Sequence, residues 1–271
     1  MKIAFIGGGN MAAALIGGLV GRGIPCADMF AIDPSELART RIEQQFGVAT
    51  GTRPDASLEA FDVIVLAVKP QVLKDAAKAF APYLRPAQLV ISVVAGIRSA
   101  DLVRWLDGHT RIVRTMPNTP ALIGMGLTAL VSRGDGDVDD RVLATQVLGA
   151  VGRTVWFDDE SKLDAVTAIS GSGPAYVFYF MEAVQEAACQ LGMTGDQARE
   201  FAVATFVGAA TLAAQSPEPP GVLRERVTSP GGTTAAALAL FDARGIKDAI
   251  VSGARAADAR ATEMGEEFGR Q

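Results

Sequence analysis

The chain begins with the apolar run Ile3-Ala4-Phe5-Ile6 and continues into Gly7-Gly8-Gly9-Asn10-Met11-Ala12. This junction fits the pattern G-x-G-x-x-A, which joins the first strand to the first helix of dinucleotide-binding folds. Gly7 permits a tight turn, Gly9 lets the backbone approach a pyrophosphate, and Ala12 lets the helix pack closely on the strand. The helix that follows would offer free amides and a partial positive charge to an anion. The alternative is a glycine turn with a structural role only.

From this junction onward, roughly the first 160 residues alternate between short apolar runs and helical stretches. The runs predict buried parallel strands at residues 3–6, 29–32, 63–68, 89–93 and 111–115. Helices are expected between them at residues 10–21, 35–46, 71–81 and 100–106. A further strand pair, 127–132 and 154–157, flanks a helix near 139–148 and would extend the sheet. Repeated units of this kind indicate an α/β, Rossmann-like dinucleotide-binding domain over residues 1–160.

The second half of the chain has a different pattern. Beyond the acidic run Asp158-Asp159-Glu160 no convincing strand follows, so an all-α domain is expected over residues 161–271. Helices are predicted at residues 161–169, 174–191, 194–214, 233–243 and 246–268. Thr194 and Gln197 form a capping-box pattern at the start of the third helix, and Pro217 cannot continue it. An apolar helical domain of about 110 residues suggests faces that are buried against another copy of the chain.

The composition limits the possible functions. Of the 271 residues, 49% are hydrophobic and 20% are charged, which is enough to bury a sizeable core. A net charge of −5 and an isoelectric point near 5.0 argue against a general nucleic-acid binder. His109 is the only histidine, so a His-rich zinc site is impossible and no metal site is expected. We interpret residues 107–110 as a polar loop in which His109 is solvated.

The cysteines and the first residues bear on where the protein works. Cys26 and Cys189 are far apart in the sequence and form no metal or redox spacing, so two free thiols in a reducing cytoplasm are expected. The chain starts directly on a strand-like run, which leaves no room for a targeting segment. The uncharged runs 165–181 and 201–217 are broken or too short for a membrane span of about 20 residues. Neither a membrane nor a nucleic acid is an expected partner.

The end of the second predicted strand bears on the choice of cofactor. Asp33 lies 24 residues beyond Gly9. An acid at this place commonly accepts a hydrogen bond from the ribose 2′-hydroxyl of NAD, and it would repel the 2′-phosphate of NADP unless Arg39 or Arg53 compensates. The alternative is that Asp33 only starts a turn, or that it caps the helix that begins near Ser35. Both interpretations stay open, and so does the choice between NADH and NADPH.

Further candidate contacts follow the carboxyl ends of the predicted strands, where ligands of open α/β sheets bind. Asn118 carries an amide that both donates and accepts, which suits a nicotinamide or a substrate group. An Asx turn between two prolines is the alternative for Asn118. Together with the glycine stretch, the expected cofactor contacts are Ile6, Gly7, Gly8, Gly9, Asn10, Met11, Asp33, Ser35, Ala67, Val68, Lys69, Pro70, Ala95, Gly96 and Asn118.

Two segments rich in Gly, Ser and Pro interrupt the helical half. The 170–176 segment reads Ser170-Gly171-Ser172-Gly173-Pro174-Ala175-Tyr176, and the 228–234 segment reads Thr228-Ser229-Pro230-Gly231-Gly232-Thr233-Thr234. Each precedes a predicted helix and so presents unpaired amides, small hydroxyls and little bulk, which suits a carboxylate or another small anion. A helix–helix connection with a cap is the alternative for either segment alone. Two such segments in a chain with a dinucleotide site favour a substrate site.

These residues carry a family resemblance. The chain resembles the pyrroline-5-carboxylate reductases nearly end to end, through residues 5–11, 67–70, 118–120, 164–167, 170–176 and 229–234. The resemblance implies a nicotinamide-binding Rossmann domain joined to a helical dimerisation domain. It also implies dimers that commonly assemble into larger rings, with an active site where two subunits meet. The family usually prefers NADPH, often with a small hydroxyl residue where this chain has Asp33.

The implied reaction is the reduction of the cyclic imine 1-pyrroline-5-carboxylate to L-proline with NADPH or NADH. An imine nitrogen is far more basic than a carbonyl oxygen, so it can take its proton before the hydride arrives, and a hydroxyl suffices to orient it. By resemblance, Thr234 would bind the imine nitrogen as the proton donor, and Ser229, Gly231, Gly232 and Thr233 would hold the substrate carboxylate. A plain helix N-cap is the alternative role for Thr234.

Two other functions stay open. A β-hydroxyacid dehydrogenase would share the two-domain plan but needs a catalytic lysine just after the 170–176 segment. This chain has Lys162 before that segment and no further lysine until Lys247, which argues against that reading. A non-catalytic nicotinamide-binding sensor would bind the cofactor without turnover, and it would have no need of a carboxylate site beside the nicotinamide.

Overall fold

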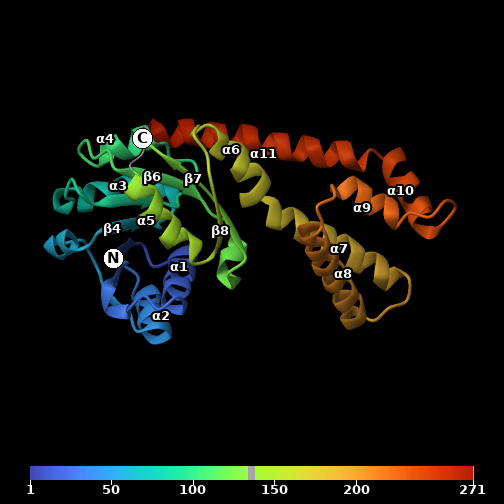
Figure 1. Ribbon diagram of the computed structural model, residues 1–271, viewed down its shortest axis with the longest axis horizontal. Coiled ribbons are helices and arrows are strands. Elements are labelled where there is room, and N and C mark those ends of the chain that lie inside the picture. Colours follow the sequence, from blue (N-terminus) through green and yellow to red (C-terminus); the bar gives the residue numbers. More distant parts are fainter. Residues whose placement is uncertain (134–137, 271) are drawn as a thin grey trace. The chain divides into compact units, whose positions relative to one another are not determined.

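The computed structural model describes residues 1–133 and 138–270, and their contacts divide the chain into two compact units (Figure 1). The first unit comprises Met1–Ser172 with Ala257–Gln271, and the second comprises Gly173–Ala256. This division differs from the expected boundary after residue 160, because the first unit includes the segments on both sides of the second. Leu163 is buried beside the sheet, and Phe268 is buried in the core of the first unit.

The first unit is built on one eight-stranded sheet of order β3-β2-β1-β4-β5-β6-β7-β8. The first six strands pair in parallel, β7 runs antiparallel to β6, and β8 runs parallel to β7. The strand order reverses between β1 and β4, and this reversal is the switch point at which ligands bind in open α/β sheets. The strands are β1 Ile3–Ile6, β2 Met29–Ile32, β3 Ala49–Gly51, β4 Val63–Leu66, β5 Leu89–Ser92, β6 Ile112–Met116, β7 Gly126–Ser132 and β8 Gly152–Trp156.

Apolar clusters cover both faces of this sheet, which explains why its central strands are apolar throughout. Phe5 enters one cluster and Ile6 enters the other, because successive side chains of a strand point to opposite faces. Helices supply the rest of each cluster. One face is covered by α1 Asn10–Gly21, α2 Glu36–Phe46 and α5 Val138–Gly149, and the other by α3 Pro70–Phe80, α4 Ser99–Trp105 and the last turns of α11 Ile246–Gly269.

The Rossmann-like architecture predicted from the sequence is confirmed, with element ends shifted by a few residues. The predicted helix at 161–169 is α6 Lys162–Val166 followed by a π-helical turn, Thr167–Gly171. Among the strands and α-helices of the described residues, the three-residue strand β3 and the helix α9 Pro220–Arg226 were not predicted. β3 is too short to show a pattern, and α9 begins on Pro220, which is favourable at a first helical position although it reads as a break.

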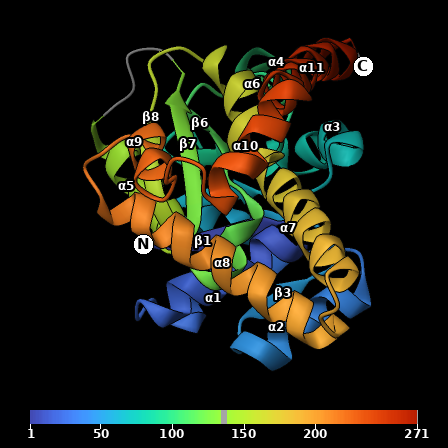
Figure 2. The same ribbon diagram turned by 90° about the vertical axis from the view of Figure 1, so that its right-hand side faces the viewer.

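The second unit, Gly173–Ala256, is helical, as predicted. α7 and α8 pack against each other, and the views in Figures 1 and 2 show them as neighbours. The predicted capping box is present, because Thr194 Oγ1 accepts from the Gln197 amide and Gln197 Oε1 accepts from the Thr194 amide. The helices of this unit are α7 Gly173–Gln190, α8 Gly195–Gln215, α9, α10 Thr233–Ala243 and the first part of α11.

The helical unit has almost no core of its own. Within residues 173–256, all of which the structure describes, Ala198 and Ala202 are the only buried residues. Large apolar side chains stay exposed instead, among them Phe178 at 59%, Tyr179 at 69% and Phe201 at 60%. An apolar surface of this kind is typical of a face that binds another protein chain.

In residues 1–133 and 138–270, no helix has both the length and the apolar character needed to cross a membrane.

Candidate functional site

The glycine turn joins β1 to α1 at the switch point of the sheet. Gly7 has a φ of +106°, and a Cβ placed there would lie 2.6 Å from the carbonyl oxygen of Ala67. The Gly7 amide donates to the Ile32 carbonyl at 2.8 Å, so Gly7 is enclosed between β2 and β4. A Cβ at Gly9 would meet only this same Ala67 oxygen, at 3.9 Å, among the described atoms within 4 Å. Gly7 therefore serves the turn itself, whereas Gly9 keeps space open over the start of the helix.

The first turn of α1 is suited to an anion. The N-cap is Gly9, which has no side chain to occupy the first amides, and the first turn, which lies within the described residues, holds no acidic residue. The first amides of a helix have no acceptor within the helix, and the helix dipole adds a partial positive charge beside them. This arrangement, with the space over Gly9, fits the pyrophosphate of a dinucleotide.

Asp33 faces the glycine turn from the end of β2. Its Oδ2 accepts from the Gly8 amide at 2.7 Å, and its Oδ1 accepts from the Ser35 amide at 2.8 Å. Ser35 is the N-cap of α2, and its Oγ accepts from the Ala38 amide at 3.4 Å. The carboxylate therefore starts the turn into α2, as one interpretation predicted, whereas the cap of that helix is Ser35 and not Asp33. Asp33 also lies against the glycine turn, and its contact with the ribose of a cofactor stays a prediction.

Two arginines of α2 bind the backbone around Asp33. Arg39 donates through Nη1 to the carbonyl oxygens of Asp33 at 2.8 Å and of Pro34 at 2.9 Å. Arg41 donates through Nη2 to the Gly8 carbonyl at 2.7 Å. The sequence pointed to Arg39 as a base near Asp33 but missed Arg41.

A signal for Arg41 was present in the helical spacing. Ala38 lies three residues before Arg41, and Ile42 lies one residue after it. A Cβ placed at Gly8 would lie 3.4 Å from the Ala38 side chain and 3.0 Å from the Ile42 side chain. Positions three and four residues apart share one helix face, so Arg41 lies at the edge of the face that covers the turn. Its Nη1 also donates to Asn10 Oδ1 at 2.9 Å, which joins α2 to the first residue of α1.

The candidate contacts after β4 and β5 lie at the carboxyl ends of these strands. The Ala67 amide donates to the last carbonyl of β1 at 2.8 Å, which holds this segment beside the glycine turn. Lys69 is exposed and is the N-cap of α3. Gly96 has a φ of +76°, and a Cβ there would lie 3.4 Å from Phe268, so the side of Gly96 that lacks a side chain faces α11. Val68, Pro70 and Ala95 lie next to these residues in the chain at the same edge.

Asn118 uses its amide within the protein. Its Oδ1 accepts from the Leu127 amide at 2.9 Å, and its Nδ2 donates to Ser170 Oγ at 3.1 Å. Asn118 Oδ1 accepts from the second residue of β7 rather than from a neighbour two residues along, so the Asx-turn alternative is wrong. Asn118 thus ties the loop after β6 both to β7 and to the 170–176 segment, and one Nδ2 hydrogen remains for a ligand.

The start of the 170–176 segment is held in a π-helical turn, Thr167–Gly171. The Ser172 amide donates to the Thr167 carbonyl at 2.8 Å and closes this wide turn. Gly171 lies so close to β6 that a Cβ would come within 2.4 Å of Met116 Cε. Isolated π turns are frequent at functional sites because they displace the residues that follow. Here the turn brings Ser170 to the ligand edge of the sheet, beside Asn118.

A polar cluster that sequence reasoning missed anchors this turn. Arg98 pairs with Asp164 of α6 at 2.6 Å, and Thr262 of α11 donates to the same carboxylate at 3.1 Å. Arg114 of β6 pairs with Glu160 at 3.0 Å, with its side chain only 3% exposed. Burial lowers the pKa of Arg114, and the Glu160 carboxylate opposes that effect. An arginine inside a predicted buried strand was the available signal.

The 228–234 segment forms the entry to α10 in the second unit. The Gly232 amide donates to the Ser229 carbonyl at 3.0 Å, and Gly231 has a φ of +70°. Gly232 is the N-cap of α10, so Thr233 and Thr234 are its first two residues. The alternative of an N-cap role for Thr234 is therefore wrong. Because the N-cap Gly232 has no side chain to cap the helix, the first amides of α10 are available to an anion in the described structure.

His109 is not the solvated loop residue that was expected. It is half-buried and lines a small cavity with Leu84 and Leu106, and its amide donates to the Leu106 carbonyl at 3.0 Å. Its Nε2 is buried without a hydrogen-bond partner among the described residues, and burial lowers the pKa of the imidazole.

In residues 1–133 and 138–270, no group of three or more His, Cys, Asp or Glu side chains is placed to hold a metal ion.

Comparisons with known proteins match both halves of the chain. A sequence model for pyrroline-5-carboxylate reductase dimerisation matches residues 160–264, and one for NADP oxidoreductase, coenzyme F420-dependent, matches residues 2–96. The pyrroline-5-carboxylate reductase of Pseudomonas aeruginosa is 43% identical over 99% of this chain and 98% of its own. The chain belongs to the pyrroline-5-carboxylate reductase family. The Haemophilus influenzae member is 41% identical over 97% of each chain.

Solved structures of the family share the fold. A pyrroline-5-carboxylate reductase from Coxiella burnetii superimposes with a TM-score of 0.89 at 36% identity, over 97% of this chain and 98% of its own. The Plasmodium falciparum enzyme, solved with NADP bound, gives a TM-score of 0.87 at 28% identity over 98% of each chain.

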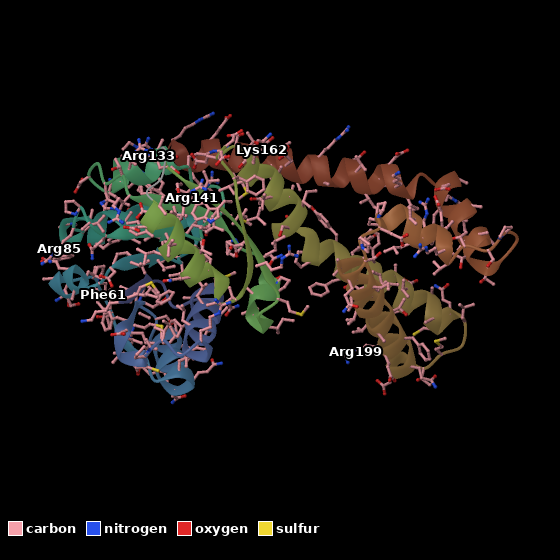
Figure 3. All side chains as sticks on the ribbon, in the orientation of Figure 1. Phe61, Arg85, Arg133, Arg141, Lys162 and Arg199 are labelled. Carbon is pink, nitrogen blue, oxygen red and sulfur yellow. The ribbon has the colours of Figure 1, made fainter. Side chains whose placement is uncertain are left out.

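The lysine expected of a β-hydroxyacid dehydrogenase has no counterpart here, because Lys162 is exposed at the start of α6, ahead of the 170–176 segment (Figure 3).

Proposed function

We propose that this protein reduces 1-pyrroline-5-carboxylate to L-proline by hydride transfer from NADPH or NADH, the final step of proline biosynthesis. The observation that carries this proposal is the match to pyrroline-5-carboxylate reductases over nearly the whole chain, with the glycine turn and the 228–234 segment both present. The glycine turn offers a dinucleotide site, and the start of α10 offers an anion site.

The cofactor is assigned to the switch point of the sheet. The first amides of α1 would hold the pyrophosphate, and the space over Gly9 admits it. Asp33 and Ser35 would border the adenosine ribose, and Lys69 and Asn118 would border the rest of the dinucleotide. When it is bound, the reduced nicotinamide supplies the hydride.

The substrate is assigned to the 228–234 segment. The amides at the start of α10 and the Ser229 hydroxyl would bind the carboxylate, because a helix N-terminus favours an anion. The Thr234 hydroxyl would donate a hydrogen bond to the imine nitrogen and orient it. The basic imine takes up its proton readily, so a strong acid such as a histidine is not required.

The helical unit is assigned to a homodimer. The exposed aromatic side chains Phe178, Tyr179 and Phe201 lie in a unit with only two buried residues, and a second copy would cover them. The family model matched over residues 160–264 is one of dimerisation. The assembly of dimers into a larger ring, an active site where two subunits meet, and a cytoplasmic location with free Cys26 and Cys189 stay predictions.

The test is steady-state reduction of 1-pyrroline-5-carboxylate by the purified protein, followed by oxidation of NADH and NADPH in separate series. We expect proline as the product with at least one cofactor. Absence of turnover with both cofactors would contradict the proposal, and cofactor binding without turnover would favour the sensor. Oxidation of 3-hydroxyacids with NAD, in the absence of proline formation, would favour the β-hydroxyacid dehydrogenase.

A further inference from the structure

The Asp33 carboxylate occupies the amide donors at the end of β2. The Gly8 amide points to one oxygen at 2.7 Å, and the Ser35 amide points to the other at 2.8 Å. The amide of Ala38, the third residue of α2, is bound by Ser35 Oγ at 3.4 Å. Exposed amides at a strand-to-helix turn ordinarily form a ready anion site. In this chain the protein's own carboxylate takes two of these amides, those of Gly8 and Ser35.

Two arginines of α2 near this carboxylate are also engaged within the protein. Arg39 Nη1 donates to two carbonyl oxygens, those of Asp33 and Pro34. Arg41 directs both terminal nitrogens at the glycine turn, to the Gly8 carbonyl and to Asn10 Oδ1. A hollow between the glycine turn and α2 is lined by Gly8, Gly9, Ser35, Ala38 and Arg41, so a substituent on the ribose would enter next to these groups.

A second anion at this place would meet two costs. The 2′-phosphate of NADPH carries close to two negative charges and would lie beside a carboxylate, where like charges repel. Its oxygens would also lack the Gly8 and Ser35 amides, which already donate to Asp33. The ribose hydroxyls of NADH are neutral donors, and an ionised carboxylate with two occupied acceptor sites retains further lone pairs for them.

We infer that Asp33 makes this chain select NADH over NADPH, an inference that rests on the proposed function only for the presence of a nicotinamide cofactor. Asp33 acts in two ways: it repels the 2′-phosphate and it withholds the amides that would bind it. Arg41 has a different role. Because it holds the glycine turn through Gly8 and Asn10, its removal weakens both cofactors alike and leaves the selectivity in place.

The test is equilibrium binding to the full-length protein, with no substrate present. NADH and NADPH are titrated by fluorescence, and ADP-ribose and 2′-phospho-ADP-ribose are titrated by calorimetry. We expect the unphosphorylated member of each pair to bind at least about tenfold more tightly, a difference of about 1.4 kcal/mol. Asp33→Ser should move this ratio toward the phosphorylated member by about tenfold or more. Arg41→Ala should lower the affinity for both members with the ratio unchanged.

Asp28→Ser is the matched control, because Asp28 precedes β2 at the opposite end of the strand that Asp33 follows. It removes the same charge from the chain and should leave the ratio as it is. The inference is overturned if the wild-type protein binds the phosphorylated members as tightly as the others, or if Asp33→Ser leaves the ratio unchanged while its circular dichroism matches the wild type. Should Asp33→Ser fail to fold, the wild-type comparison of the two ADP-riboses still decides. Binding needs no turnover, so a failure of catalysis alone would count against the proposed function only.

Discussion

Asn118 donates an Nδ2 hydrogen to Ser170 Oγ at 3.1 Å and so joins the loop after β6 to the π-helical turn Thr167–Gly171. The same amide accepts from Leu127 at the start of β7. One side chain therefore fixes three segments at the ligand edge of the sheet. The residue singled out from the sequence as a ligand contact has a positioning role that the sequence did not show.

The first prediction concerns this bond. Asn118→Ala removes both amide contacts and leaves the Leu127 amide without its acceptor, so we expect a lower free energy of unfolding and a lower kcat/KM. Ser170→Ala removes only the bond to Asn118, worth about 1 kcal/mol or about fivefold in kcat/KM. Steady-state kinetics and urea unfolding of both variants measure the two effects. Equal unfolding free energies for the two variants would show that the contact between Asn118 and the Leu127 amide does not stabilise the protein.

The second prediction separates the two glycines of the turn. Gly7→Ala forces a Cβ against Ala67 at a φ of +106°, so we expect a destabilised protein, by about 1 to 3 kcal/mol. Gly9→Ala meets open space and should unfold at the wild-type urea concentration. Its cofactor affinity should fall by about tenfold or more, since the methyl group occupies the approach of the pyrophosphate. Wild-type cofactor affinity in folded Gly9→Ala would remove Gly9 from the site.

The third prediction tests the proton donor. Thr234→Ala should lower kcat by about a hundredfold or more, the contribution expected of a positioned acid group. The second residue of α10 carries no cap bond, so the fold and the affinity for the cofactor should not change. Thr234→Ser keeps the hydroxyl and is the matched control, with kcat close to that of the wild type. Near-normal turnover by Thr234→Ala would exclude this hydroxyl from the reaction.

The fourth prediction concerns the buried arginine of β6. Glu160→Ala leaves the Arg114 guanidinium, 3% exposed, without its carboxylate. We expect the free energy of unfolding to fall by about 2 to 3 kcal/mol. This is less than the loss usual for a fully buried ion pair, because the Glu160 side chain is 30% exposed. Glu267→Ala breaks the exposed pair with Arg260 and should leave the urea midpoint unchanged. Similar urea midpoints for the two variants would contradict the claim that the Arg114–Glu160 pair stabilises the folded protein.

The fifth prediction is a pH dependence that arises at His109. Burial lowers the pKa of His109 in the folded protein below its ordinary value of 6.5. The unfolded chain therefore binds more protons below about pH 6.5, and the free energy of unfolding falls as the pH falls through this range. Between about pH 7 and about pH 5, the thermal unfolding midpoint of His109→Gln should fall less than that of the wild type. Above pH 7 the two midpoints should run in parallel, and parallel curves throughout would contradict the assignment.

The sequence was sufficient to predict those parts of the fold that depend on local pattern. Apolar runs such as Ile3–Ile6 and the glycine turn have a period and a composition of their own, so β1, α1 and the parallel direction of the first strands followed from them. The antiparallel direction of β7 did not follow. Nothing in a seven-residue apolar strand records the direction of its neighbour, because that direction depends on the path of the loop before it.

The site could be predicted only in part, for a similar reason. Backbone sites such as the start of α1 are visible in a motif, since the glycines that create them are adjacent in the sequence. Contacts between distant side chains, such as Arg98 with Asp164 or Arg41 with Asn10, depend on how helices pack and have no local pattern. The same holds for Asn118, whose partners lie 9 and 52 residues away.

The last helix has a consequence for the order of events during synthesis. Phe268 fills the core of the unit that contains the N-terminus, and Arg104 donates to the carbonyl of Gly269 at 2.6 Å. A ribosome releases the chain from its N-terminal end, and N-terminal domains generally fold first. Here the first unit cannot complete its hydrophobic core until the last turns of α11 have been translated. The growing chain must therefore carry an incomplete Rossmann unit while all of residues 173–256 are being made.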